Sequence, residues 1–330
     1  MNSKYKLHSS IIICIFLISV LLPLSSFAQF GPTTNLDNVS QKWLDIDYAG
    51  DGLQGHKMDI YLPKDVNNAP FPVIVTIGGS AWFSNNVKQM GVGRCSLLLD
   101  KGFALVAVNH RASSEAKFPA QINDIKGTVR FLRANASKYK LDPGFIGIMG
   151  DSSGGHLAAL MGTSSSVKDY TIGDKTLDIE GNIGGNENQS SHVDAVVDLY
   201  GPTVFYKMNS QRIEGGMDHD GASSPESSLI GAPIQQNHDL CDLASPLAYV
   251  DANDPSFLMI HGDADPLVPH GQSILLKEAL TERKVKNELI IVPGGGHGDG
   301  RIWSKEHLEK IGEFFTEEKN KKLAVTSNKN

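Results

Sequence analysis

The chain of 330 residues contains only three cysteines, has no internal repeat and shows no cluster of basic residues. Three cysteines are too few for a disulfide-rich scaffold, and none of them are spaced like zinc-finger ligands. Thirty basic side chains stand against 37 acidic ones, which gives a formal charge of −7. Without a basic patch to overcome that charge, neither nucleic acid nor an anionic membrane surface is an expected partner.

The amino-terminal segment has the pattern of a secretory signal peptide. Lys4 and Lys6 precede an apolar run over residues 11–22, and residues 26–28 (Ser-Phe-Ala) form a small-x-small cleavage signature. We predict cleavage before Gln29, which removes two lysines and changes the formal charge to −9. A membrane anchor fits less well, because the apolar run is shorter than the roughly 18 residues that a spanning helix needs. The mature protein is therefore expected to be secreted or periplasmic and free of the membrane.

Cleavage also removes Cys14 and leaves Cys95 and Cys241, far apart in the sequence. In an oxidising compartment two such thiols can pair, so the sequence is compatible with both a disulfide and two free cysteines. The remaining composition, 40% hydrophobic and 20% charged with 33 Gly and 15 Pro, is that of an ordinary globular protein and excludes disorder, collagen and coiled coil.

Short apolar runs and helical periodicities alternate along the mature chain. Residues 43–48 and 57–62 alternate polar with apolar side chains around a Gly-Asp-Gly turn, which predicts an opening hairpin. Six nearly continuous apolar runs predict parallel strands buried on both faces. They span residues 71–77, 103–108, 145–149, 193–199, 257–260 and 288–292.

Helical spacing separates these runs. Ile122, Ile125, Val129, Leu132 and Ala136 recur at steps of three and four residues, and the same spacing returns in residues 274–280. The alternation predicts a single doubly wound α/β domain over residues 29–330, with helices on both faces of the sheet. Ligands are then expected at the carboxyl ends of the strands.

Two segments, residues 164–192 and 208–242, interrupt the alternation. The first is rich in Gly, Asn and Ser, and the second mixes Gly, Pro, His and Asp with little periodicity. Segments of this length without a regular pattern are usually lids, binding loops or disordered excursions. We predict that both are lid or insert segments and that the second covers the substrate, with a solvated loop as the alternative.

The strongest functional motif covers residues 150–156, Gly-Asp-Ser-Ser-Gly-Gly-His, directly after a predicted strand and at the start of a predicted helix. This is a G-x-S-x-G sequence in the context that it requires, where a sharp turn between glycines exposes the Ser152 hydroxyl at a helix N-terminus. A phosphate-binding turn is the alternative, but no lysine of the P-loop type follows. The motif therefore predicts a nucleophilic serine.

A nucleophilic serine needs a base and an acid that orients the base. Asp263 and Asp265 follow the strand at 257–260, and His297 stands among glycines after the strand at 288–292. The order Ser152, Asp265, His297 is the one expected in this fold, although Asp263 shares the loop and is the alternative acid.

Other histidines are weaker candidates for the base. His156 is expected to pack near the serine turn and His261 to close a strand as a satisfied core residue, while His219, His238 and His270 are placed at the surface or in the second insert.

Acyl transfer also needs backbone donors for the developing oxyanion. Ser153 is predicted to supply one N–H, and the Gly-Gly-Ser-Ala-Trp loop after the strand at 71–77 is predicted to supply the second through Gly79 or Ser80. A plain turn is the alternative for this loop. Trp82, Asp151 and Glu226 are further candidates for substrate binding.

No cofactor or metal ion is expected. Residues 91–96, Gly-Val-Gly-Arg-Cys-Ser, resemble half of a dinucleotide fingerprint, but the last glycine is missing and no strand precedes them.

The sequence resembles the bacterial feruloyl-esterase-like (BD-FAE) branch of the α/β-hydrolase superfamily, which is related to hormone-sensitive-lipase esterases. Beyond the serine motif, the resemblance rests on residues 118–124 (Phe-Pro-Ala-Gln-Ile-Asn-Asp), 131–135, 201–203 (Gly-Pro-Thr), 224–227 (Ser-Pro-Glu-Ser), 245–246 (Ser-Pro), 261–265 and 296–297, and it spans residues 61–315. Residues 77–80 read Ile-Gly-Gly-Ser where related esterases commonly read His-Gly-Gly-Gly, so an imidazole that stabilises this loop is absent.

The resemblance implies an α/β-hydrolase fold with Ser152 as nucleophile, Asp265 as acid and His297 as base. It implies hydrolysis of carboxylic esters, including feruloyl or acetyl esters of plant polysaccharide. The two inserts are polar and lack an amphipathic apolar helix, which predicts short or aromatic acyl groups over long fatty acids. The expected partner is thus a small or carbohydrate-linked ester. A peptidase of the prolyl oligopeptidase type and a non-catalytic binding scaffold are the alternatives; the first lacks room for its large amino-terminal domain, and the second should lack a triad residue.

Overall fold

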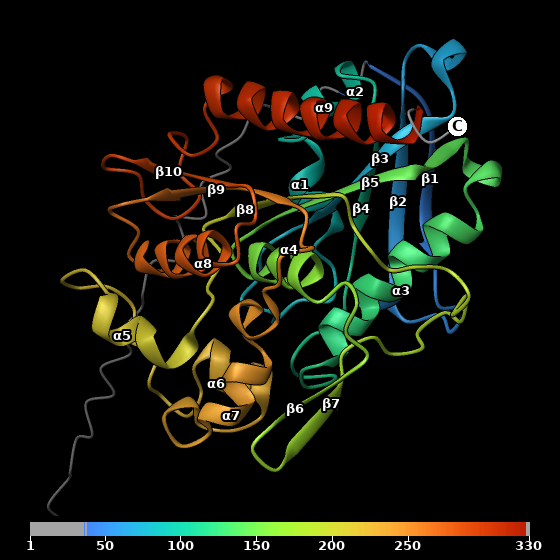
Figure 1. Cartoon of the computed structure of the whole chain (residues 1–330). Helices are drawn as coiled ribbons and strands as arrows, with labels where there is room; N and C mark the ends of the chain where they lie inside the picture. Colours follow the sequence, from blue (N-terminus) through green and yellow to red (C-terminus); the bar gives the residue numbers. More distant parts are fainter. Residues whose placement is uncertain (1–35, 37, 328–330) are drawn as a thin grey trace, which may run out of the picture. The chain divides into compact units, whose positions relative to one another are not determined.

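One sheet of eight strands runs through residue 36 and residues 38–327, the part of the chain that this computed structural model describes (Figure 1). In spatial order the strands are β1 (Val39–Asp47), β2 (Lys57–Pro63), β4 (Ala104–Val108), β3 (Phe71–Ile77), β5 (Leu141–Asp151), β8 (Ala195–Leu199), β9 (Ser256–Gly262) and β10 (Asn287–Val292). From β4 to β10 neighbouring strands are parallel, whereas β2 pairs antiparallel with both β1 and β4. The predicted sheet, mostly parallel with an antiparallel opening hairpin, is confirmed.

Helices and a second small sheet occupy the connections. The α-helices are α1 (Lys88–Val92), α2 (Leu97–Asp100), α3 (Ala120–Ala134), α4 (Ser153–Thr163), α5 (Met208–Gln211), α6 (Pro225–Ile230), α7 (His238–Leu243), α8 (Gly271–Glu282) and α9 (Lys305–Ser327). A hairpin of β6 (Asp169–Ile172) and β7 (Lys175–Asp178) stands apart from the main sheet. Short 3₁₀ turns lie at Gln54–His56, Val66–Asn68, Ser137–Tyr139, Phe205–Lys207, Ile234–Gln236 and Pro246–Tyr249.

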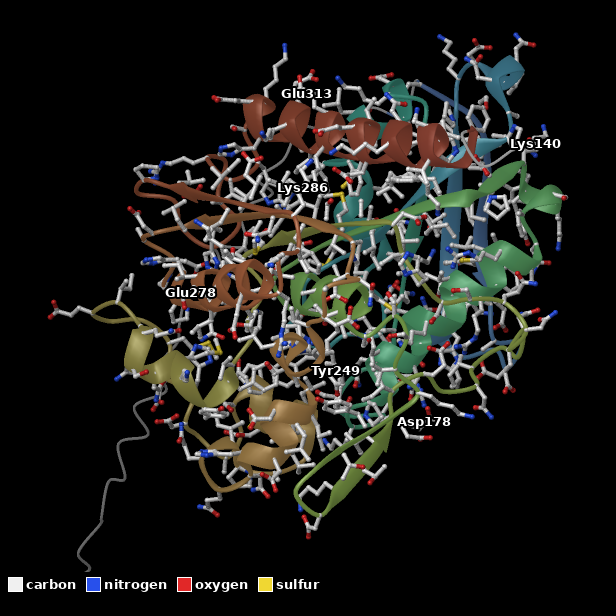
Figure 2. All side chains as sticks on the ribbon, viewed as in Figure 1. Lys140, Asp178, Tyr249, Glu278, Lys286 and Glu313 are labelled. Atoms are coloured by element: carbon white, nitrogen blue, oxygen red, sulfur yellow. The ribbon has the colours of Figure 1, made fainter. Side chains whose placement is uncertain are left out.

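Both faces of the sheet are covered by helices. Alternate side chains of β3 face opposite ways: Val75 belongs to the hydrophobic cluster shared with α3, α4 and α8, and Ile74 belongs to the cluster shared with α2 and α9. Figure 1 shows α9 along one side of the sheet and α3, α4 and α8 along the other. Charged side chains such as Glu278 and Glu313 project from the outer faces of α8 and α9 (Figure 2). Because both faces are buried, the central strands appear in the sequence as nearly continuous apolar runs.

Two expectations about these elements were wrong. β10 pairs only with β9, at the edge of the sheet, so most of its side chains are partly exposed instead of buried on both faces. Ala136 lies beyond α3, although it continues the helical spacing. It is buried all the same, because the chain turns after α3 and packs Ala136 into the same cluster.

The two segments that lacked a predicted pattern contain short regular elements. Residues 164–192 hold the β6–β7 hairpin, and residues 208–242 hold α5, α6 and most of α7. Elements of four to six residues are too short to produce a recognisable period. The first segment packs against α3 through Glu180, whose carboxylate binds Lys126 at 3.0 Å and also pairs with Arg130.

The two cysteines of the described chain do not pair. Cys95 and Cys241 are buried free thiols in the clusters on opposite faces of the sheet. Cys14 and the predicted signal peptide, residues 1–28, lie outside the described residues. Among the helices that are described, none combines the length and the apolar character needed to cross a bilayer.

Candidate active site

Ser152 lies at the sharp turn between β5 and α4, at the carboxyl end of the parallel strands. Its backbone has φ 55° and ψ −125°, which is a strained conformation for a residue with a side chain. A Cβ on Gly150 would lie 2.1 Å from the Gly154 carbonyl oxygen, and a Cβ on Gly154 would lie 2.1 Å from the Ile77 carbonyl oxygen. The turn therefore requires glycine at both positions, which explains the spacing of the motif.

Three side chains from different strand ends meet at this turn. His297 Nε2 lies 3.0 Å from Ser152 Oγ, and His297 Nδ1 lies 2.8 Å from Asp265 Oδ2. Asp265 follows β9 and His297 follows β10, the two strands beyond β8. Residues 145 positions apart in the sequence are thus joined in one hydrogen-bonded chain.

Asp265 is held as a buried carboxylate. Its Oδ1 accepts the N–H groups of Leu267 and Val268 at 2.8 and 2.9 Å, and its Oδ2 also lies 3.4 Å from His261 Nε2. Burial alone would raise the pKa of the Asp265 carboxyl, but its hydrogen bonds with His261 and His297 outweigh burial and hold the pKa well below its usual range.

The ionised Asp265 fixes the tautomer of His297. A carboxylate can only accept hydrogen bonds, so His297 Nδ1 carries the proton and Nε2 is left to accept from the Ser152 hydroxyl. The alternative acid, Asp263, is exposed and accepts the Gly294 N–H at 2.6 Å, without a contact to the imidazole. The geometry therefore favours Asp265 over Asp263 as the partner of His297.

The two amides predicted as alternatives for the second oxyanion donor, those of Gly79 and Ser80, have other partners. Ser80 N–H donates to Ser153 Oγ at 2.8 Å, and the Gly79 N–H interacts with the Asp151 carboxylate. The next residue, Ala81, has φ 52° and lines the pocket beside the serine turn. Within the described chain its N–H has no hydrogen-bond acceptor. This geometry does not fit the prediction for Gly79 or Ser80, and it presents the N–H of Ala81 together with that of Ser153.

A small pocket of about 80 Å³ opens beside Ser152 and His297. Most of its walls are apolar. They include Trp82, Pro202, Met217, Pro225, Leu267 and Val268. Of the two insert segments, only residues 208–242 contribute to these walls among the described residues, and the roles of both as lids stay predictions.

Two of the three candidate substrate-binding residues, Trp82 and Glu226, lie in the wall of this pocket. The third, Asp151, does not. Its carboxylate lies 3.4 Å from the Tyr200 hydroxyl, and the Tyr200 ring packs edge-on against His297 with centroids 4.8 Å apart. Burial raises the pKa of Asp151, although the charge of Arg94 partly opposes the shift. Asp151 is therefore in position to support the imidazole through Tyr200, and its role toward substrate stays a prediction.

The sequence did not identify His219, which was expected at the surface or in the second insert. The structure buries it to 2% exposure in the pocket wall, with Nδ1 3.0 Å from Glu226 Oε1 and Nε2 2.8 Å from the Leu267 carbonyl oxygen. Its partners lie in α6 and in the loop after β9, so no helical or strand spacing in the sequence marks it. His156 and His261 are buried and bonded to backbone carbonyls, as expected.

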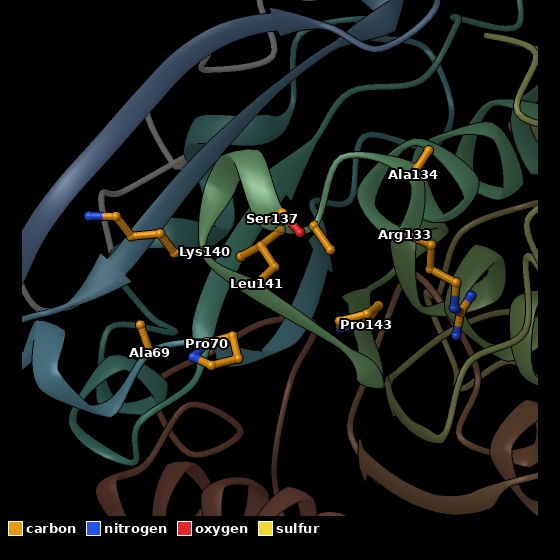
Figure 3. Close-up of a pocket in the computed structure, with 9 residues that line it drawn as sticks. Ala69, Pro70, Arg133, Ala134, Ser137, Lys140, Leu141 and Pro143 are labelled. Atoms are coloured by element: carbon orange, nitrogen blue, oxygen red, sulfur yellow. The ribbon is translucent and has the colours of Figure 1, made fainter.

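A wider hollow of about 480 Å³ lies at the opposite end of β5 from Ser152 (Figure 3). Pro70, Arg133, Lys140 and Leu141 line part of it, near the amino ends of β3 and β5. Ligands of parallel α/β sheets bind at the carboxyl ends, so the pocket beside Ser152 remains the candidate site.

The sheet, the serine turn and the contacts among Ser152, His297 and Asp265 define an α/β-hydrolase. The BD-FAE family profile matches residues 58–280, and the chain belongs to this family. The resemblance seen in the sequence is thereby confirmed.

The relatives that this chain matches are named as esterases. Esterase LipQ of Mycobacterium tuberculosis is 31% identical over 241 residues, which cover 72% of this chain and 52% of LipQ. The chain spans about half the length of the curated relatives that it matches. A truncated carbohydrate esterase from gut microbiota is 45% identical with a TM-score of 0.81, covering 86% of this chain and 98% of the other. A bifunctional GH43-CE protein of Bacteroides eggerthii is 51% identical with a TM-score of 0.80, covering 84% of this chain and 35% of the other.

Proposed function

We propose that this protein is a serine carboxylesterase that works through an acyl-enzyme. The observation that carries the proposal is the line of contacts from Asp265 through His297 to Ser152, with distances of 2.8 and 3.0 Å. A serine hydroxyl becomes a nucleophile when a base removes its proton during attack, and His297 Nε2 is in position to do so. The esterase names of the relatives support the class of reaction.

Acylation begins when Ser152 Oγ bonds to the carbonyl carbon of the ester while its proton passes to His297 Nε2. Asp265 keeps the imidazole oriented and stabilises the imidazolium that forms. The oxyanion accepts hydrogen bonds from the backbone N–H groups of Ser153 and Ala81. When the tetrahedral intermediate collapses, the bond to the alcohol oxygen breaks, and His297 returns its proton to the departing alcohol.

Deacylation follows the same route with water in place of serine. His297 takes a proton from water as the water oxygen bonds to the acyl carbon. The bond to Ser152 Oγ then breaks, and the proton passes back to that oxygen. The product is a free carboxylic acid, and every step uses groups of the chain itself.

The size of the pocket supports a short acyl group. Its volume of about 80 Å³ is roughly half that of the cavity of about 150 Å³ that takes up benzene in an engineered protein. A feruloyl group adds a three-carbon chain to a substituted ring and would extend out of such a pocket. Acetyl and propionyl esters are therefore the favoured substrates, and the carbohydrate esterase relative supports a sugar as the alcohol.

Hydrolysis of p-nitrophenyl acetate by the wild type and Ser152→Ala tests the mechanism. We expect the variant to lose at least about 10³-fold in kcat, because removal of a triad serine costs that much or more. Ser210→Ala, at an exposed serine on α5, is the control and should match the wild type. Equal rates for Ser152→Ala and the wild type would reject the mechanism, as would loss of wild-type activity on addition of a chelator.

The proposal includes export of the mature chain, which rests on the sequence of residues 1–28. Amino-terminal sequencing of the protein recovered from periplasm or medium should begin at Gln29. Recovery of the uncleaved chain from the cytoplasm alone would contradict this part of the proposal.

A further inference from the structure

A residue in the wall of the pocket beside Ser152 carries a buried carboxylate oxygen that no group of the described chain satisfies. Glu226 lines the pocket and is 3% exposed. Its Oε1 contacts His219, but its Oε2 has no hydrogen-bond partner in the part of the chain that the structure describes. A buried acceptor left without a donor is costly, so Oε2 has the capacity to accept a hydrogen bond from a group outside the chain.

The hydrogen bonds of His219 indicate how it pairs with Glu226. The Leu267 carbonyl oxygen can only accept, so His219 Nε2 carries a proton. Burial alone would lower the pKa of His219, but its hydrogen bond with Glu226 and the charge of that carboxylate outweigh burial and raise the pKa. The geometry and this shift both favour an imidazolium–carboxylate pair, in which His219 Nδ1–H donates to Glu226 Oε1 at 3.0 Å.

A neutral hydrogen-bond donor suits the remaining oxygen of this pair, Glu226 Oε2, better than a charged one. His219 already balances the charge of Glu226, so a cationic ligand would leave an excess positive charge in a buried place. The group must also be small, because it shares a pocket of about 80 Å³ with the reacting ester. A hydroxyl group satisfies both conditions.

We propose that Glu226 Oε2 binds a hydroxyl group of the ester substrate and thereby selects hydroxyl-bearing esters. This inference rests on the proposed esterase function and names the substrate feature that the same site recognises. The hydroxyl can belong to the alcohol, as in a sugar ester where free hydroxyls neighbour the acylated one, or to the acyl group, as in a hydroxy acid ester. In either case Glu226 is a specificity-determining residue, and His219 is a positioning residue that holds its carboxylate in place.

Three small esters separate the sources of the hydroxyl. Ethyl acetate has none, 2-hydroxyethyl acetate has one on the alcohol and ethyl glycolate has one on the acyl group. The measured quantity is the kcat/KM of each hydroxylated ester divided by that of ethyl acetate. Comparing this ratio between wild type and variant cancels the intrinsic reactivity of the esters.

Glu226→Gln keeps the size of the side chain and an oxygen that can accept from His219, but it can place an NH₂ donor where Oε2 stood. We expect it to reduce the ratio for one of the hydroxylated esters by about tenfold to a hundredfold, since hydrogen bonds to charged groups are worth that much. The ester that is affected identifies the source of the hydroxyl. His219→Gln should reduce the same ratio, because it removes the imidazole that holds Glu226 Oε1 and so orients Oε2. Glu278→Gln, the same change at an exposed site on α8, should leave the ratio at the wild-type value (Figure 2).

Ratios unchanged by Glu226→Gln in a folded protein would overturn the inference, and so would a wild type that shows no preference for either hydroxylated ester. If Glu226→Gln does not fold, the ratio measured with His219→Gln decides. A wild type that hydrolyses none of the three esters and no p-nitrophenyl acetate would instead reject the proposed function itself.

Discussion

Asp265 and Asp263 stand two residues apart on one loop, but only Asp265 touches His297. We expect Asp265→Asn to lower kcat by about 10⁴, the cost of the same change in a well-studied triad, because an amide NH₂ can donate to Nδ1 and stabilise the wrong tautomer. Asp263→Asn keeps an oxygen to accept the Gly294 N–H and should lose at most about tenfold. Steady-state kinetics on p-nitrophenyl acetate measure both effects.

The melting temperature of each variant is the control for this comparison. An asparagine at 265 retains one oxygen that can accept the N–H groups of Leu267 and Val268, so the variant should stay folded. A folded, active Asp265→Asn beside a crippled Asp263→Asn would move the acid by two residues.

Some residues of the site can be predicted from the sequence more readily than others. Ser152 and His297 could be predicted because glycines surround them and strands precede them, and the order of the chain then selected Asp265. The second oxyanion amide could not be fixed between Gly79 and Ser80, because the partner of the Ser80 N–H is the Ser153 hydroxyl, 73 residues away. His219 was missed for a related reason, since one of its two partners, the Leu267 carbonyl, lies 48 residues away.

At the scale of the element, β8 carries a buried acid directly beneath the serine turn. Asp198 is fully buried, and its Oδ1 accepts the Gly201 N–H at 2.9 Å. Its Oδ2 has no partner among the described residues. Burial raises the pKa of the Asp198 carboxyl to about 6, although the Gly201 hydrogen bond and the charge of His261 oppose the shift.

This raised pKa makes stability depend on pH. The folded state binds the Asp198 proton more tightly than the unfolded state, whose pKa is near 3.8. The contribution of Asp198 to the free energy of unfolding is therefore fully present below about pH 4 and is lost as the pH rises through about 6. Asp198→Asn stays neutral and should be more stable than the wild type at pH 8 by up to about 3 kcal/mol, with little difference at pH 4. Urea unfolding at both pH values measures this, and a difference that does not change with pH would contradict it.

Whole elements were predictable where they are long or buried. The central strands appeared as apolar runs because helices cover both faces of the sheet, and α3 appeared through its period. The elements of residues 164–192 and 208–242 were missed because each has at most six residues. The partial exposure of β10 was also missed, because an apolar run in the sequence does not show whether a strand has one neighbour in the sheet or two.

At the scale of the whole molecule, the alternation of strands and helices predicted the fold class, but not the spatial order of the strands. That order decides what meets at the site. β5, β8, β9 and β10 are consecutive neighbours, so the loops after β5, β9 and β10 converge at one edge of the sheet. The loops can be predicted from the sequence, but the long-range strand pairing that brings them together cannot.

His297 follows β10, which is an edge strand of the sheet. β10 pairs only with β9 and is largely half-exposed, whereas β5, which carries Ser152, lies between β3 and β8 in the buried centre. Regions with few buried contacts open at lower free energy than the core. Detachment of this edge would separate base from nucleophile while the rest stays folded, so mild denaturant should inactivate the enzyme locally and reversibly. In a urea titration the activity midpoint should then fall below the midpoint followed by far-ultraviolet circular dichroism, and coincident midpoints would instead mean that edge and core unfold as one cooperative unit.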